Sequence, residues 1–135
     1  MSPSSTSLAM TVHSHKSVGS ISFGSSKDDL PDLGPLLSER LNSLGELDLD
    51  FGEIIYRFAE HGLVEASFPL PETLELNGER VKGDLLVEHL RKHDSKFRAE
   101  HGFAIAPTFG IAVDLDEDSS RPWVTAFELG RWDDL

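Results

Sequence analysis

The stretch Phe103–Leu115, FAIAPTFGIAVDL, decides the fold that the sequence predicts. Every odd position in it is apolar or Pro107, and most even positions are small. This period of two predicts a long strand with one bulky face and one thin face. Pro107 is expected to bend the strand or to place it at a sheet edge. The thin face would let a helix or a partner approach the backbone closely.

Further strand signals lie on both sides of this stretch. The loop 116–122 turns the chain, and residues 123–129 alternate again, so a partner strand is expected there. Residues 18–23 and 64–68 show the same alternation over shorter lengths. Asn77-Gly78 is a dipeptide typical of tight hairpin turns.

Three other stretches have the spacing of helices. Leucines three or four residues apart predict a helix over 32–44. Asp50 and Glu53 have the spacing of a capping box, which predicts a second helix over 50–61. A third helix is expected over 84–101.

The order of these elements indicates an α+β fold, with a mostly antiparallel sheet and about three helices packed on it. A length of 135 residues fits one domain. Residues 1–16 are rich in serine and contain no acid, so they are expected to form a flexible tail. The remaining residues, 17–135, would form the single α+β domain.

Composition excludes several classes of function. The chain has no cysteine, which removes disulfides, thiolate nucleophiles and cysteine-ligated metals. No apolar run approaches the ~20 residues of a membrane helix, so we expect no membrane partner and a cytoplasmic location. A net charge of −12 argues against direct binding to a nucleic-acid backbone.

The negative charge is unevenly distributed. Residues 28–60 contain nine acids against Arg40 and Arg57, whereas residues 82–101 contain five bases against four acids. Opposite charge accelerates encounter and favours the right partner. The pattern therefore points to a basic protein partner.

Two acidic stretches and the C-terminus supply candidate partner-binding residues. Three carboxylates alternate with apolar residues in 46–51, and an extended backbone would direct them to one side. They would either contact a basic partner there or form only a solvated surface. Residues 114–118 imitate the first half of a calcium loop, but Ser119 replaces the required glycine, which favours an acidic hairpin tip. A tryptophan followed by acids ends the chain. The candidates are Glu46, Asp48, Asp50, Asp114, Asp116, Glu117, Asp118 and Trp132.

His89 and His93 are candidate metal ligands. They are four residues apart on the third predicted helix, so one helix face could present both rings, and Glu100 on the same flank could add an oxygen. Leu90 stands where the zinc-protease pattern requires glutamate. A hydrogen-bonded histidine at the edge of the core is the alternative for His93.

No motif assigns catalysis. The chain has no nucleophile elbow, phosphate loop or dinucleotide fingerprint, so no catalytic residue and no cofactor are expected. The sequence favours a small non-enzymatic protein that binds a basic protein surface, of the inhibitor, immunity, antitoxin or decoy type. Two alternatives stay open: a metal-binding protein or enzyme centred on His89 and His93, and a chaperone or structural subunit of an assembly. The oligomeric state is not determined by these patterns.

Overall fold

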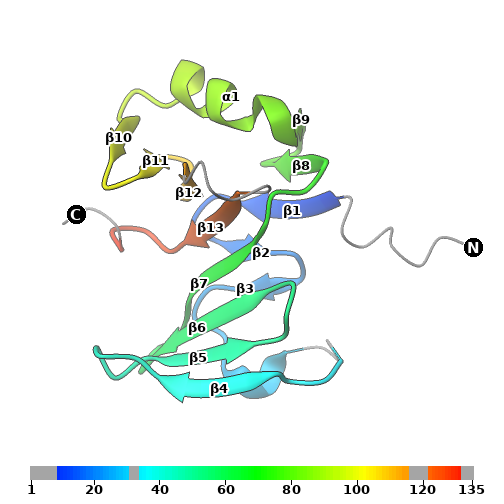
Figure 1. Cartoon of the computed structure of the whole chain (residues 1–135), viewed down its shortest axis with the longest axis vertical. Coiled ribbons are helices and arrows are strands. Elements are labelled where there is room, and N and C mark those ends of the chain that lie inside the picture. Colours follow the sequence, from blue (N-terminus) through cyan, green and yellow to red (C-terminus); the bar gives the residue numbers. More distant parts are fainter. Residues whose placement is uncertain (1–8, 31–33, 116–121, 132–135) are drawn as a thin grey trace, which may run out of the picture.

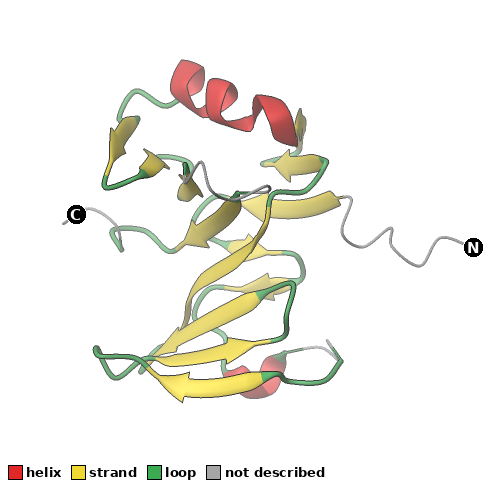
Figure 2. Ribbon diagram, in the orientation of Figure 1, coloured by secondary structure: helices red, strands yellow, loops and turns green. Residues whose placement is uncertain are grey.

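The computed structural model describes residues 9–30, 34–115 and 122–131, which form two sheets and one α-helix (Figure 1, Figure 2). The five-stranded sheet has the order β3 (Ile21–Ser22), β2 (Ser17–Val18), β1 (Ala9–His13), β8 (Thr73–Leu76) and β9 (Glu79–Lys82). The eight-stranded sheet has the order β10 (Arg98–Glu100), β11 (Phe103–Ala106), β12 (Ile111–Asp114), β13 (Trp123–Phe127), β7 (Gly62–Pro69), β6 (Ile55–Ala59), β5 (Leu47–Asp50) and β4 (Ser38–Leu41). The helices are the 3₁₀ turns η2 (Lys27–Asp29) and η3 (Gly83–Leu85) and the α-helix α1 (Leu86–His93). All strand pairs are antiparallel except β1–β8.

One buried cluster joins the two sheets and α1. It contains Val12 and Leu74 from the smaller sheet, Ala66 and Val124 from the larger sheet, and Leu90 from α1. The helix lies at one end of the molecule, and β4 lies at the other end (Figure 1). Among the described residues, no helix has the length and apolar character needed to cross a membrane.

The predicted α+β fold with about three helices is wrong, because the chain is mostly β and α1 is the sole α-helix in its described part. The stretch expected to be the first helix contains β4, and the second contains β6. Leu37 and Leu41 are four residues apart, a spacing that also returns to the same face of a strand. Because β4 and β6 pair with β5, both stretches form strands rather than helices.

The third predicted helix forms over a shorter range. It ends at His93 because the buried carboxylate of Asp94 accepts hydrogen bonds from the backbone N–H groups of Lys96, Thr108 and Phe109. These bonds turn the chain away from the helix axis and tie it to the turn between β11 and β12. Residues 98–100 then pair as β10 with β11 rather than continuing the helix.

The stretch predicted as one long strand is a hairpin. Gly110 has a φ of 71° and its N–H donates to the carbonyl of Ala106 at 2.9 Å, which reverses the chain between β11 and β12. The reversal changes which positions face the core. Ala104 and Ala106 now share the core cluster with Ile111 and Val113, so the predicted thin and bulky faces do not exist as such.

The strand predicted over 18–23 is instead a hairpin, because a turn at Gly19, which has a φ of 61°, divides it into β2 and β3. Several other local predictions are confirmed. Residues 64–68 lie in β7, and the strand predicted from Trp123 forms β13. Asn77 and Gly78 both have positive φ, 54° and 87°, and join β8 to β9 in a tight turn. Within the segment predicted to be a flexible tail, Ala9–His13 form β1 in the middle of the smaller sheet, whereas residues 1–8 lie outside the described residues.

Candidate functional site

Glu46, one of the predicted partner-binding residues, is held by an arginine from the C-terminal part of the chain. The Nη1 and Nη2 atoms of Arg131 lie 2.7 and 2.6 Å from its two carboxylate oxygens. The Nε of the same guanidinium donates to Glu65 on β7. Both glutamates are buried, and Arg131 forms an ion pair with each of them.

Asp48, a second predicted partner-binding residue, belongs to the same network. Its two oxygens accept from Nε and Nη2 of Arg57 at 2.7 and 3.1 Å, and Nη1 of Arg57 donates to Glu65 at 3.1 Å. The strand register places Asp48, Arg57 and Glu65 side by side across β5, β6 and β7. We call the five residues Glu46, Asp48, Arg57, Glu65 and Arg131 the ion network.

Electrostatics keeps members of the ion network charged. The hydrogen bond from Arg131 lowers the pKa of the Glu46 carboxyl, against the opposing effect of burial. The hydrogen bond to Asp48 raises the pKa of Arg57, and the hydrogen bond to Glu46 raises the pKa of Arg131. The charges of Glu46 and Asp48 are therefore compensated within the chain.

The other described acids of residues 28–60 lie outside the ion network. Asp50, the third residue of the predicted acidic stretch, is half-buried and accepts a hydrogen bond from the N–H of Gly52 at 2.8 Å. Five exposed acids of residues 28–60 make no ion pair with any described residue. They are Asp28, Asp29, Glu39, Glu53 and Glu60. We call the first four of these the acidic end.

The other predicted acidic site is described only in part. Asp114 is half-buried at the end of β12. Asp116, Glu117, Asp118 and Trp132 lie outside the described residues.

The histidines of α1 are close to each other, but the predicted third ligand is elsewhere. The rings of His89 and His93 have centroids 4.6 Å apart, and His89 also lies beside Phe109. Glu100 is on β10, where it pairs with Arg98 and His101. In the described ranges no group of three or more histidine or acidic side chains could hold a metal ion. His93 is exposed, so it is not the core-edge histidine of the alternative interpretation.

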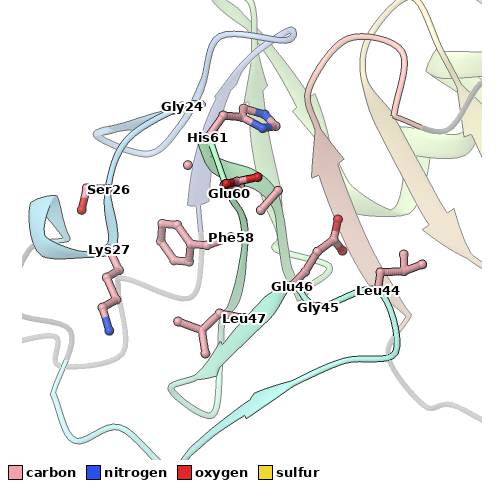
Figure 3. A pocket seen from close by; sticks show the side chains of 12 residues that line it. Gly24, Ser26, Lys27, Leu44, Gly45, Glu46, Leu47, Phe58, Glu60 and His61 are labelled. Carbon is pink, nitrogen blue, oxygen red and sulfur yellow. The ribbon is translucent and has the colours of Figure 1, made fainter.

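An open groove of about 660 Å³ borders the ion network (Figure 3). Leu47 and Phe58 line it from β5 and β6, and Lys27 lines it from η2. Glu46 and His61 border it at the ends of the strands. The mixture of apolar and charged groups suits contact with a protein side chain, and no sequence motif indicates the groove.

Exposed leucines at β4 were missed by the sequence reasoning. Leu37 and Leu41 are 64% and 69% exposed, and Leu44 in the following turn is 76% exposed. In the sequence, these leucines form only the stripe that predicts a helix over 32–44. Clusters of exposed apolar side chains are typical of interaction surfaces.

Comparison with known proteins gives no functional information. No protein-family model matches the chain, and searches of curated proteins and of solved structures found no significant match.

Proposed function

We propose that this chain is a protein-binding module that engages a basic surface of another protein through its acidic end. The observation that carries the proposal is the division of acids in residues 28–60. Glu46 and Asp48 have arginine partners, whereas the acids of the acidic end are exposed and make no ion pair with the described residues.

The location of the acidic end supports the proposal. η2, β4 and the β5–β6 turn lie at the end of the molecule remote from α1 (Figure 1). Lys27 and Arg40 are the exposed bases in the same segments. The local field is therefore negative and would attract a basic surface.

The opposite end of the molecule has a different charge. α1 carries the exposed bases Arg91 and Lys92 against one exposed acid, Glu88, which lies 3.9 Å from Arg91. The nearby acid Asp94 is buried and bonded to backbone N–H groups. A molecule with an acidic end and a more basic end aligns in the field of a charged partner. This favours approach with the acidic end forward.

The proposal covers inhibitors, immunity proteins, antitoxins and decoys, which share this mode of binding. The absence of cysteine is compatible with the reducing cytoplasm, where we place the interaction. Asp114, Asp116, Glu117, Asp118 and Trp132 stay in the proposal as a secondary contact.

Capture from a native lysate tests the proposal. The full chain is immobilised beside a variant that neutralises the acidic end and a control variant that neutralises four exposed acids elsewhere. The acidic-end variant is Asp28→Asn/Asp29→Asn/Glu39→Gln/Glu53→Gln, and the control is Glu72→Gln/Glu79→Gln/Asp84→Asn/Glu88→Gln.

We expect the wild type and the control to retain the same basic protein at low salt and the acidic-end variant to lose it. Retention should also fall steeply as salt rises, because exposed charges are screened. Equal capture by all three chains would refute the acidic end as the binding surface.

A further inference from the structure

β4 is the last strand of the eight-stranded sheet, and its outer edge has no neighbouring strand among the described residues. The N–H of Asn42 donates to the carbonyl of Glu46, and Asn42 is in register with β5. Backbone groups alternate in direction along a strand, so those of Glu39 and Leu41 point away from β5. They are available to another extended chain.

The side chains on one face of this edge have a simple pattern. Glu39 and Leu41 occupy alternate positions of β4, and the register places Glu39 beside Leu49 and Leu41 beside Leu47. Leu37 precedes the strand, and its N–H donates to the carbonyl of Asp50 at 2.8 Å. Leu47 and Leu49 face the core. The apolar face of the sheet therefore continues past the covered region onto β4, where Glu39 and Leu41 are open to solvent.

We infer that an extended segment of the partner adds to β4 as a further strand of the sheet. The segment carries apolar, basic and apolar residues at every second position: an apolar residue covers Leu41, and a lysine or arginine lies opposite Glu39. The pattern reads the same from either end, so it suits a parallel or an antiparallel strand. This inference rests on the proposed function and names how the basic partner is held.

A second copy of the chain does not fit this edge. A symmetric antiparallel pair that keeps the sheet faces aligned must place one residue opposite itself. Pairing of the whole of β4 centres on Glu39 or on Arg40, and each choice puts like charges face to face. A centre at Leu41 would pair only the end of the strand, because Asn42–Gly45 form the turn to β5.

Peptide binding tests the inference on the full chain. The probe is acetyl-Thr-Ile-Thr-Lys-Thr-Ile-Thr-amide with a fluorescent label, and a scrambled peptide of the same composition is its control. Binding is measured by fluorescence anisotropy for the wild type, for Leu41→Lys, and for the control Leu85→Lys at the other end of the molecule. Leu85 is also exposed, at 55%.

We expect the alternating peptide to bind at least about fivefold more tightly than the scrambled one, the scale of the favourable cross-strand pairs that only the former makes. Leu41→Lys should weaken it by about fivefold or more, and Leu85→Lys should leave it unchanged. Amide shifts of the labelled chain should concentrate on β4 and β5. Sedimentation should show no dimer formed through β4.

Three results would overturn the inference. Equal binding of the two peptides would show that charge alone attracts them, and the proposed function would then stand without strand addition. Absence of binding by either peptide would show that β4 does not accept a strand. A dimer broken by Leu41→Lys would make the occupant a second copy. Failure of the lysate capture, by contrast, would refute the proposed function whatever the peptides do.

Discussion

Two groups of acids from the same segment of sequence have opposite environments in this molecule. Glu46 and Asp48 are bonded to Arg131 and Arg57 on the sheet, whereas Glu39 and Glu53 are exposed and make no ion pair with the described residues. The first pair of charges stabilises the fold, and the second is available to a partner. Net charge therefore says less about binding than the position of each acid's counter-charge.

Removal of Arg131 should give the largest effect on this comparison. Arg131→Ala removes the guanidinium that bonds to both Glu46 and Glu65, in a region where both acids are buried. We expect a loss of about 3 kcal/mol in the free energy of unfolding, measured by urea denaturation at pH 7. Arg131→Lys keeps the charge without the two-pronged geometry and should lose less. A change below about 0.5 kcal/mol, typical of surface sites, would show that the ion network does not stabilise the fold.

Glu46 should make stability depend on pH in the acid range. Its folded pKa is lowered below the ordinary value of 4.5, chiefly by Arg131, so its contribution is present above pH 4.5 and is lost as pH falls through the folded pKa. Glu46→Gln should be about 2 kcal/mol less stable than the wild type at pH 7. The difference should shrink at pH 3 and below. Urea denaturation across this range measures it, and a constant difference would contradict the role of ionised Glu46.

Tyr56 lies on the face of β6 opposite to Arg57, in the core. Its titration therefore tests the core side of the sheet. Burial raises its pKa from 10.0 to about 12, so the folded state loses stability as pH rises from about 10 to 12. Linkage gives a loss on the order of 1 kcal/mol at pH 11 from this group. Tyr56 is the one tyrosine of the chain, so ultraviolet absorbance in alkali reports it alone. A tyrosinate midpoint near 10 in the folded protein would refute its burial, and Tyr56→Phe should remove this part of the alkaline loss.

Neutralising the acidic end should change stability least. Glu39→Gln/Glu53→Gln alters two exposed acids that make no ion pair within the described residues, so we expect the free energy of unfolding to stay within about 0.5 kcal/mol of the wild type. The same variant should weaken capture of the basic partner. If it unfolds the chain instead, the distinction between structural and available acids fails.

Much of the local β structure was predictable, because it depends on alternation and turn residues. Asn77-Gly78 marked the turn between β8 and β9, and the alternation from Trp123 marked β13. The helical interpretation of 32–44 failed because leucines four residues apart fit both a helix and one face of a strand. Only pairing with β5, which depends on the distant chain, distinguishes the two.

The candidate site was less predictable than the strands. The alternation predicted that Glu46 and Asp48 share one side of an extended backbone, as they do. The arginines that bind them, Arg131 and Arg57, lie elsewhere in the sequence. Arg131 is 85 positions away from Glu46 along the chain, and no local signal connects them. Similarly, Asp94 ends α1 through bonds to Thr108 and Phe109, which separates Glu100 from His89.

The parallel pair β1–β8 has a consequence for the order of folding. Ser14, just after β1, bonds to Asn77, 63 residues later in the chain, and β1 lies between β2 and β8 in its sheet. Closing so long a loop costs more entropy than forming the hairpin of β8 and β9, whose turn is two residues long. During synthesis, β1 leaves the ribosome first but cannot complete its sheet until β8 has followed. We therefore expect the pairing of β1 with β8 to form after the local hairpins of β1 with β2 and of β8 with β9.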